Sequence, residues 1–293
     1  MANNLRVFNT NSEYQSADLV HPAVSYVIET DKVIYEPTPP TPSFKFKATY
    51  SGGEIYEKEC DGNTTLLAIN TKPSGYDYTK MTSAEIGDCV TSIDFYAFNN
   101  FSSLTSVNIS DSVTYVNELN FGGCENLPVE DNIRYADTFL VKAVDKTLTT
   151  YNIKEGTKWI GVNAFNGCIN LIDIHLPNSL LGAIGNSTFY NCSGLTSIII
   201  PDGVTGIGSS AFQECRSLTS CTIGSGVRFI NQYAFTRCTS LTSITIKATT
   251  PPALSSGVFG GSTCPIYVPS QSVNVYKTAS GWSYYASRIQ PIP

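Results

Sequence analysis

The sequence has few charged residues and almost no histidine. Charged side chains make up 14% of its 293 residues, against about 25% in a typical soluble domain, and there are two histidines. The formal net charge is −6, so the chain lacks the excess positive charge that attracts nucleic acids and anionic membranes. We expect neither nucleic acid nor membrane lipid as a partner.

Two kinds of segment are also missing. No run of 18 apolar residues occurs, as a membrane-spanning helix would require. The first residues, MANNLRVFNTNSEYQ, contain no basic region followed by an apolar one. This pattern predicts a protein that is made in the cytoplasm and not exported by a cleavable signal. Because the cytoplasm is reducing, we expect the nine cysteines to be mostly free thiols, with Cys60 and Cys89 as buried thiols.

The motifs of catalysis and metal binding are absent as well. HExxH, GxSxG, GxxxxGK[ST] and CxxC do not occur. Asp173 and His175 form an Asp-x-His pair that could help to bind a metal, but no third ligand is identifiable, and a solvated strand face also explains the pair. We therefore expect no enzymatic activity, no cofactor and no bound metal.

What the chain does contain is a repeat. Five segments share one frame: AFNNFSSLTSVNIS, AFNGCINLIDIHLP, TFYNCSGLTSIIIP, AFQECRSLTSCTIG and AFTRCTSLTSITIK, and NFGGCENLPVED is a degenerate sixth. Their phenylalanines are 23 or 24 residues apart, with one gap of 44, at Phe98, Phe121, Phe165, Phe189, Phe212 and Phe235. In all but the first segment a cysteine follows three residues later, at Cys124, Cys168, Cys192, Cys215 and Cys238. A fixed period of this length is typical of a solenoid.

Each repeat predicts the same local structure. The L-T-S-I-x-I segment places apolar residues two apart, as in a strand with one buried face, and Phe-x-x-Cys suggests a single helical turn. One copy buries about seven side chains, each contributing roughly 1.5–3 kcal/mol, whereas ordering its residues costs about 1–2 kcal/mol each. No copy is stable alone, so the copies must stack. Cys215 and Cys221, which takes the place of an isoleucine, are both predicted to be small apolar fillers.

This pattern closely resembles the BspA-like leucine-rich repeats, a variety common in bacterial surface proteins, over residues 82–263. The resemblance implies a mainly β solenoid, a right-handed leucine-rich-repeat superhelix of about six stacked repeats of 23–24 residues. It also implies a β-rich N-cap and a small C-terminal cap with a short helix. Residues 132–165 look like the long repeat variant of the family, and we expect a hairpin insertion at 132–153 that turns at Asp145 and Lys146.

We predict five parts along the chain: an N-terminal module at 1–36, the Pro-rich linker PTPPTP at 37–42, the N-cap at 43–89, the repeats at 90–263 and the C-terminal cap at 264–293. In the C-terminal cap a short strand, IYVP, should lead to a helix near 270–279. The aromatic residues Trp282, Tyr284 and Tyr285 should then pack as a lid.

The N-terminal module is predicted to be a small β unit, with a hairpin turning near Thr30 and Asp31 and with LRVF as a third strand. About 36 residues rarely sustain an independent core, so we expect this module to assemble with itself, giving a homo-oligomer, or to dock on another protein. The candidate anchoring residues are Val7, Phe8, Tyr14, Val24, Tyr26, Ile28, Val33 and Tyr35.

The outward side of the stacked strands is the candidate binding face. Such small polar side chains are usually solvated sheet, but they could also form a shallow, flat site for a host-surface protein or glycan. The residues are Ser106, Asn108, Asp173, His175, Ser197, Ile199, Ser220, Thr222, Ser243 and Thr245.

The sequence suggests two possible functions. The segment VFNTNSEYQSADLVHPAVSYVIETDKVIYEP is similar to short N-terminal modules of structural proteins in phages that infect gut anaerobes. This similarity suggests a virion component, a head or tail fibre or decoration protein, that docks through residues 1–36 on another virion protein. The alternative is a bacterial surface adhesin or interaction scaffold, located at the cell surface.

Overall fold

The computed structural model describes residues 3–8, 14–19, 24–29, 32–37, 44–117 and 119–293. The chain divides into two compact units, Met1–Phe44 and Lys45–Pro293, each of which is described by itself. Among the described residues, no helix has the length and apolar character needed to cross a bilayer.

The smaller unit consists of two antiparallel strand pairs. Strand β1 (Asn3–Phe8) pairs with β2 (Tyr14–Leu19), and β3 (Val24–Glu29) pairs with β4 (Lys32–Pro37). The predicted hairpin is therefore confirmed by the pairing of β3 with β4, although its turn, Thr30 and Asp31, lies outside the described residues. LRVF forms part of β1 as expected, whereas β2 was missing from the sequence-based prediction.

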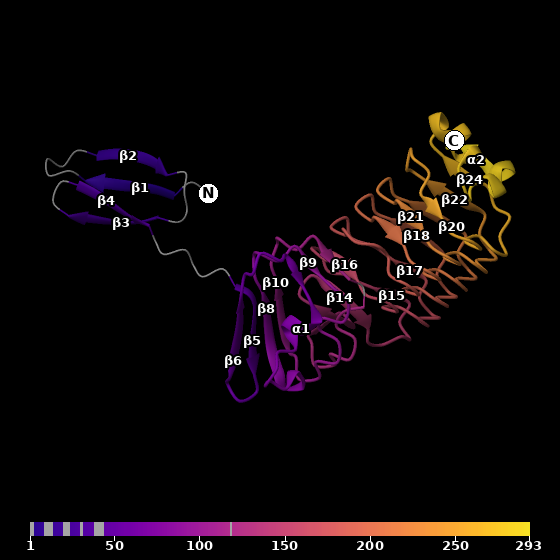
Figure 1. The fold of residues 1–293 in the computed structure, drawn as a ribbon. Coiled ribbons are helices and arrows are strands. Elements are labelled where there is room, and N and C mark those ends of the chain that lie inside the picture. Colours follow the sequence, from indigo (N-terminus) through magenta and orange to yellow (C-terminus); the bar gives the residue numbers. More distant parts are fainter. Residues whose placement is uncertain (1–2, 9–13, 20–23, 30–31, 38–43, 118) are drawn as a thin grey trace. The chain divides into compact units, whose positions relative to one another are not determined.

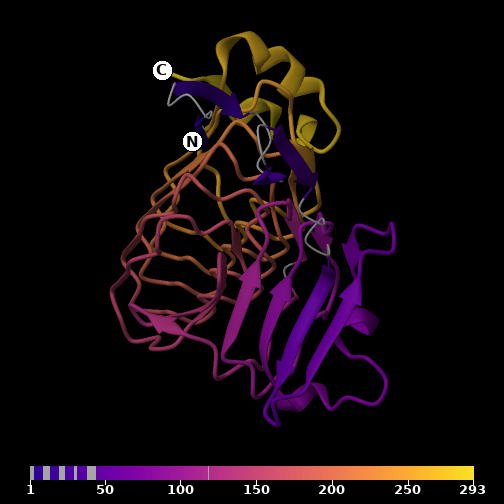
Figure 2. The ribbon, with the colours of Figure 1, turned by 90° about the vertical axis from the view of Figure 1, so that its left-hand side faces the viewer.

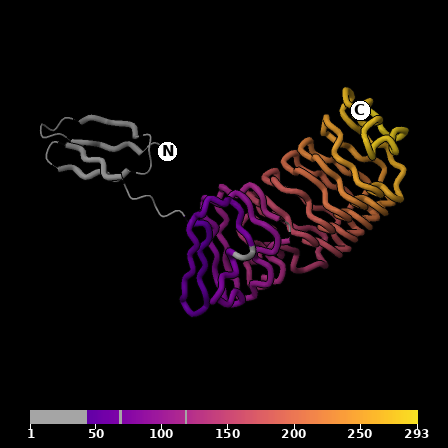
Figure 3. The backbone as a smooth tube through the Cα atoms, viewed as in Figure 1, coloured from indigo at the N-terminus to yellow at the C-terminus, as the bar shows by residue number. Residues whose placement is uncertain are grey.

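The larger unit is a solenoid whose turns stack from β5 to the C-terminal helices (Figure 1), with each turn of the backbone following the course of the one before it (Figure 3). It has about 10 turns. The β-solenoid prediction is thus confirmed, but the expected count of about six repeats is low. Irregular segments before, within and after the six copies also form turns, although they lack the full consensus.

The longer strands of the solenoid lie on one side of each turn. At its N-terminal end four strands lie next to one another (Figure 2) in the order β10-β8-β5-β6, with β5 antiparallel to β8 and β10 parallel to it. Further along, parallel strands run in the order β18-β20-β22-β24-β25, and β15 pairs with β17. The bounds are β5 Phe44–Tyr50, β6 Ile55–Glu59, β8 Met81–Ile86, β10 Ser106–Ile109, β15 Thr150–Tyr151, β17 Asp173–Ile174, β18 Ser197–Ile200, β20 Ser220–Ile223, β22 Ser243–Ile246, β24 Ile266–Val268 and β25 Ile289–Pro291.

Two-residue strands form a second ladder, which we call the short-strand face. It contains two parallel runs, β11-β9-β7 and β19-β21-β23, and β16 continues it through bridges at Ile160, Ile184 and Ile207. The bounds are β7 Thr65–Leu66, β9 Ser92–Ile93, β11 Tyr115–Val116, β16 Trp159–Ile160, β19 Gly206–Ile207, β21 Phe229–Ile230 and β23 Ala253–Leu254. The remaining elements are α1 Ala68–Thr71, η1 Tyr78–Lys80, β12 Val129–Glu130, β13 Ile133–Ala136, β14 Phe139–Ala143, η2 Ser270–Ser272, α2 Val273–Thr278 and η3 Ser283–Arg288.

The repeated phenylalanines form a column of stacked rings inside the solenoid. Ring centroids of Phe165, Phe189, Phe212 and Phe235 are 5.1–5.2 Å apart in succession, and the planes differ by at most 9°. Offset stacking at such distances adds about 0.5–1.5 kcal/mol per pair beyond the burial of area. Phe259, which the sequence-based repeat frame did not include, extends the column beyond Phe235 at 5.9 Å.

The repeated cysteines are free thiols that fill the column beside these rings. Their Sγ atoms donate to the carbonyl oxygen of a phenylalanine one turn earlier, at 3.0–3.1 Å, in the pairs Cys124 with Phe98, Cys192 with Phe165, Cys215 with Phe189, and Cys238 with Phe212. Cys168 instead lies 3.5 Å from the hydroxyl of Tyr151. The cysteine column therefore fills the interior and also links successive turns.

The Phe-x-x-Cys segment is not the predicted single helical turn. In the repeats a residue just before Ala-Phe and another four positions later have positive φ, as at Ser187 (53°) and Asn191 (56°) or Ser210 (56°) and Glu214 (66°). The amide of each phenylalanine donates to the carbonyl of the residue before the next phenylalanine, at 2.8–2.9 Å from Phe165 to Phe235. The amide of each following cysteine does donate back to the phenylalanine carbonyl, as from Cys192 to Phe189 at 3.2 Å. The positive φ of the residue before the cysteine makes this a β-turn and not a helical turn.

The long repeat contains a hairpin, but its turn is misplaced in the sequence-based prediction. Strands β13 and β14 pair antiparallel and turn at Asp137 and Thr138, not at Asp145 and Lys146. Thr150–Tyr151 pairs instead with Asp173–Ile174 of the next turn, in parallel. Strand β14 is buried on both faces, with Phe139 and Leu140 in two separate apolar clusters, so the hairpin divides the core of the solenoid.

The expectation that Cys60 and Cys89 are buried thiols is wrong. They form a disulfide, with 6.2 Å between their Cα atoms, and both are half-buried. The bond joins the end of the β6 hairpin to the turn before β9 and closes a separation of 29 residues. The reducing-compartment argument failed here because it ignored the position of these cysteines outside the repeat column.

The C-terminal cap follows the prediction in part. The strand and the helix are present as β24 and α2, and Trp282 and Tyr285 are buried. The hydroxyl of Tyr276 donates to the carbonyl of Ala248 at 2.8 Å, and Nε1 of Trp282 donates to that of Pro252 at 2.7 Å. Tyr284 is 86% exposed, so its assignment to the packed lid is wrong.

Candidate functional site

The residues of the proposed binding face are divided among three sheets of the larger unit. On the β18-β20-β22 sheet, Ser197, Ser220 and Ser243 align in one column, and Ile199, Thr222 and Thr245 align in the next. The second column continues to Tyr267. These side chains are exposed or half-buried, as a flat binding surface requires.

Ser106 and Asn108 belong to another of these sheets, the N-terminal one. They align with Ser83 and Glu85 of β8, and with neighbouring residues of β5 they line a shallow polar groove of about 340 Å³. The structure therefore does not bring all ten predicted residues into one site.

Asp173 and His175 are both exposed on the solenoid surface. Asp173 aligns with Thr150 in the two-stranded β15-β17 sheet. Across the described part of the chain, no group of three or more histidine, cysteine, aspartate or glutamate side chains is placed to hold a metal ion. Asp173 lies in β17, whereas His175 lies just after that strand.

The predicted anchoring residues belong to the smaller unit. The backbone register pairs Phe8 with Tyr14, Ile28 with Val33, and Tyr26 with Tyr35. The side chains of Val7, Phe8, Tyr14, Val24, Tyr26, Ile28, Val33 and Tyr35 lie outside the described part of the structure, so their anchoring role remains a prediction.

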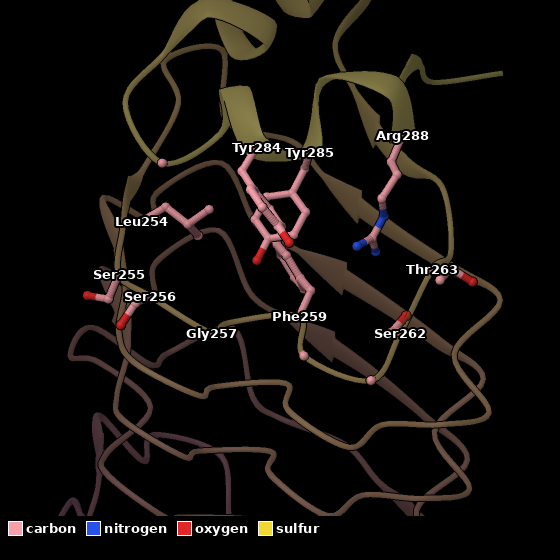
Figure 4. A pocket seen from close by; sticks show the side chains of 13 residues that line it. Leu254, Ser255, Ser256, Gly257, Phe259, Ser262, Thr263, Tyr284, Tyr285 and Arg288 are labelled. Atoms are coloured by element: carbon pink, nitrogen blue, oxygen red, sulfur yellow. The ribbon is translucent and has the colours of Figure 1, made fainter.

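A cavity of about 760 Å³ opens where the last turn of the solenoid meets the C-terminal cap. The close-up shows Phe259, Tyr284 and Tyr285 gathered on one wall and Arg288 on another (Figure 4). The guanidinium of Arg288 lies 5.2 Å from the ring centroid of Tyr285 and 5.7 Å from that of Phe259, and its Nε donates to the carbonyl of Cys264 at 2.8 Å. The cavity thus presents the fixed guanidinium of Arg288 and the exposed ring of Tyr284. Both groups are able to contact a bound ligand.

Sequence reasoning missed Phe259 and Arg288 in this cavity. The signal for Phe259 was present, because it follows Phe235 by 24 residues, but Cys264 follows it by five residues and not by three. Arg288 had no such signal, since its position depends on how the cap folds back over the last turn.

Four buried thiols, Cys124, Cys215, Cys221 and Cys238, are poorly suited to nucleophilic chemistry. Burial raises the pKa of Cys124 to about 11 and that of Cys238 to about 12, and it also raises the pKa of Cys215 and Cys221. A cysteine reacts as its thiolate, and a raised pKa leaves little thiolate at neutral pH.

The family model described as the BspA type leucine rich repeat region matches residues 70–140 and 143–264, in 6 copies. The chain belongs to this family. In solenoids of this kind stacked repeats present extended surfaces for binding, and the fold alone does not name the ligand.

Several solved structures are similar to this BspA-type chain. A leucine rich cell surface protein from Faecalibacterium prausnitzii A2-165 is 21% identical, over 85% of this chain and 75% of that chain, with a TM-score of 0.32. The T. pallidum leucine rich repeat protein is 18% identical over 76% and 88%, with a TM-score of 0.32. A leucine-rich repeat protein from Bacteroides ovatus ATCC 8483 is 19% identical over 94% and 100%, with a TM-score of 0.27.

No curated protein sequence matches the BspA-type chain significantly.

Proposed function

We propose that this protein is a non-enzymatic display and binding protein, in which the small N-terminal unit attaches to a carrier and the BspA-type array binds a target. The observation that carries this proposal is the division of the chain into Met1–Phe44 and Lys45–Pro293, which comes just after the sequence PTPPTP at 37–42. Prolines at this density favour an extended, stiff connector. An attachment unit and a binding unit on such a connector can act separately.

The smaller unit has features of an assembly element. It consists of strand pairs without a long hydrophobic segment, and two-stranded pairs are marginally stable by themselves. Pairing with a second copy or with a carrier protein would supply the missing contacts. The sequences of these strands contain Val, Ile, Tyr and Phe, which are residue types that favour β-structure.

We further propose that the carrier is a phage virion, with this chain as a head or tail appendage. The similarity of residues 1–36 to N-terminal modules of phage structural proteins supports this choice. Mass spectrometry of particles purified from a lysate tests it: we expect the chain in a fixed copy number per particle. Its absence from particles, together with antibody labelling of intact bacteria, would contradict the virion assignment.

A bacterial surface protein is the second candidate, and the Cys60–Cys89 disulfide favours it. Disulfides persist outside the reducing cytoplasm, as at a cell surface. If the chain is a bacterial surface protein, fractionation should find it on washed cells with this bond already formed, and particle preparations should lack it.

Removal of residues 1–43 tests whether attachment depends on the smaller unit alone. Because the core of the larger unit is formed within Lys45–Pro293, we expect the shortened chain to fold and to lose carrier attachment or self-assembly. Circular dichroism and size-exclusion chromatography measure both properties. A truncated chain that fails to fold, or one that still attaches, contradicts the proposal.

A further inference from the structure

A second cavity, of about 500 Å³, lies on the short-strand face, away from the predicted binding residues. Its origin is the long repeat. The ladder β11-β9-β7 ends at β11, and β16 belongs to the sheet that contains the β13–β14 hairpin. The cavity is lined by residues of both β11 and β16, including Tyr115 and Trp159. The hairpin thus interrupts the ladder and leaves a hollow at the interruption.

Aromatic rings form much of the wall. Phe95 and Tyr115 are 53% and 55% exposed, so their faces are open to a ligand. A Cβ added at Gly182 would lie 2.8 Å from Cδ1 of Trp159, and one at Gly206 would lie 2.1 Å from Cζ of Phe229. The rings of Trp159 and Phe229 therefore lie directly over glycines of neighbouring turns.

The polar groups of the wall are uncharged. Asn117, Asn186, Asn231 and Thr205 line the cavity, and its lining contains no Asp, Glu, Lys or Arg side chain. Nδ2 of Asn117 lies 3.4 Å from the hydroxyl of Tyr115, which fixes that ring. Amides and hydroxyls both donate and accept hydrogen bonds, so a ligand with hydroxyl groups can be matched here without a charge.

One buried donor in this wall has no partner. Nε1 of Trp159 makes no hydrogen bond among the described residues, and the position of a Cβ on Gly182 would be 3.5 Å from it. A buried donor without an acceptor costs free energy. An acceptor oxygen that reached this edge of the cavity would remove the cost.

We propose that this cavity binds a neutral saccharide, with sugar rings packed against Tyr115, Phe95 or Phe229 and hydroxyl groups bonded to the amides. Sugars combine an apolar C–H face with a rim of hydroxyl groups, which is the combination of aromatic faces and neutral polar groups found here. The volume lies in the range of about 300–1,000 Å³ typical of small-ligand sites. The inference rests on the proposed function in that it takes the array to be the binding part of the chain.

The test is binding of defined saccharides to the full chain. The probes are neutral oligosaccharides of glucose, galactose, mannose and N-acetylglucosamine, with sialyllactose and a heparin tetrasaccharide as charged comparators, measured by titration calorimetry. We expect at least one neutral probe to bind and the charged probes not to exceed it. Phe229→Ala should weaken the binding about tenfold, as expected when a ring contact is lost.

Two matched variants locate the site. Ala183 lines the cavity, whereas Ala253 is exposed on the same face beside Phe229 and lies outside it. Ala183→Phe should abolish binding by filling the cavity, and Ala253→Phe should leave binding and stability unchanged. Failure of all neutral probes to bind, stronger binding of the charged probes, or binding that survives Ala183→Phe in a folded protein would overturn the proposal.

The result is separable from the display function. A chain found on its carrier that binds none of the neutral probes would remove the saccharide site and leave the display function. A chain that binds the neutral probes but is absent from both virions and cell surfaces would support the saccharide site and contradict the display function.

Discussion

Two cysteines six residues apart show how little sequence proximity says about chemistry in a stacked fold. Cys215 donates its thiol hydrogen to the carbonyl of Phe189 one turn away, at 3.1 Å. Cys221 lies in a strand column, aligned with Ile198 and Ile244. Burial raises the pKa of both thiols. The spacing of the two cysteines therefore reflects the repeat, and both are apolar fillers as the sequence predicted.

Valine substitutions at Cys215 and Cys221 should change the free energy of unfolding by different amounts. Cys221→Val should change the free energy of unfolding by about 0.5 kcal/mol or less, because that column normally holds a branched apolar residue. Cys215→Val removes a donor and adds volume next to stacked rings, which should cost about 1–3 kcal/mol. Urea denaturation measures both changes. Equal losses would show that the thiol hydrogen bond contributes nothing.

A second residue-scale prediction concerns Lys45 and Asp61. The Lys45 side chain is 1% exposed and its Nζ lies 3.0 Å from Oδ1 of Asp61. This hydrogen bond is the main reason that the pKa of Asp61 falls from 3.8 to about 2. A depressed pKa in the folded state stabilises the protein above the ordinary value of 3.8, and the contribution disappears as the pH falls towards 2.

Asp61→Asn should therefore be less stable than the wild-type protein at pH 7, and the difference should shrink between pH 4 and pH 2. Thermal denaturation across that range measures it. Glu57→Gln is the control, because Glu57 and Lys47 are 3.8 Å apart and both substantially exposed, so little change is expected. A difference between Asp61→Asn and wild type that is independent of pH would contradict the assignment.

Among the elements, the N-cap depends on its disulfide. The Cys60–Cys89 bond ties the β5–β6 edge to the first short strands. Replacing both cysteines with serine should lower the stability of this cap by about 2–4 kcal/mol, as is usual when a disulfide is lost.

Thiol titration checks the pairing independently. The denatured protein should show the seven free cysteines without reductant and all nine after reduction. Nine reactive thiols in the unreduced protein would contradict the disulfide.

The sequence predicted the elements that depend on local pattern and missed those that depend on distant contacts. Strands β18, β20 and β22 follow from alternation within each repeat. The position of the hairpin turn could not be predicted in this way, because the sequence offers two similar turn signals, Asp137-Thr138 and Asp145-Lys146. Only the packing of β14 between two cores distinguishes them. The short-strand cavity was missed for the same reason: Tyr115, Trp159 and Phe229 lie in different repeats and meet only when the ladder is interrupted.

On the scale of the whole molecule, the core has two parts. One cluster contains Phe46, Phe98, Phe121 and Phe139, and the other contains Tyr151, Phe165 and the rings that follow as far as Trp282. Each turn contacts mainly its neighbours, so stability is shared between adjacent turns and does not belong to the array as one unit.

We therefore expect the two parts of the solenoid to unfold at different urea concentrations. Hydrogen exchange followed by mass spectrometry should show β5 and β8 losing protection at one midpoint and β20 and β22 at another. Reducing the Cys60–Cys89 bond should shift the first midpoint and leave the second in place. One shared midpoint under both conditions would show that the hairpin transmits cooperativity across the division.

The bonds between turns also bear on how the gene for such a chain can change length. From Phe165 to Phe235 each repeated phenylalanine donates its amide forward to a main-chain carbonyl of the next turn. The repeated cysteines Cys192, Cys215 and Cys238 donate back to a main-chain carbonyl of the previous turn. The acceptors are main-chain carbonyls, which are the same whatever side chains a neighbouring copy carries. Recombination between repeats in register would therefore insert or delete a whole turn without creating an unmatched junction, so related proteins can differ in reach while both caps stay intact.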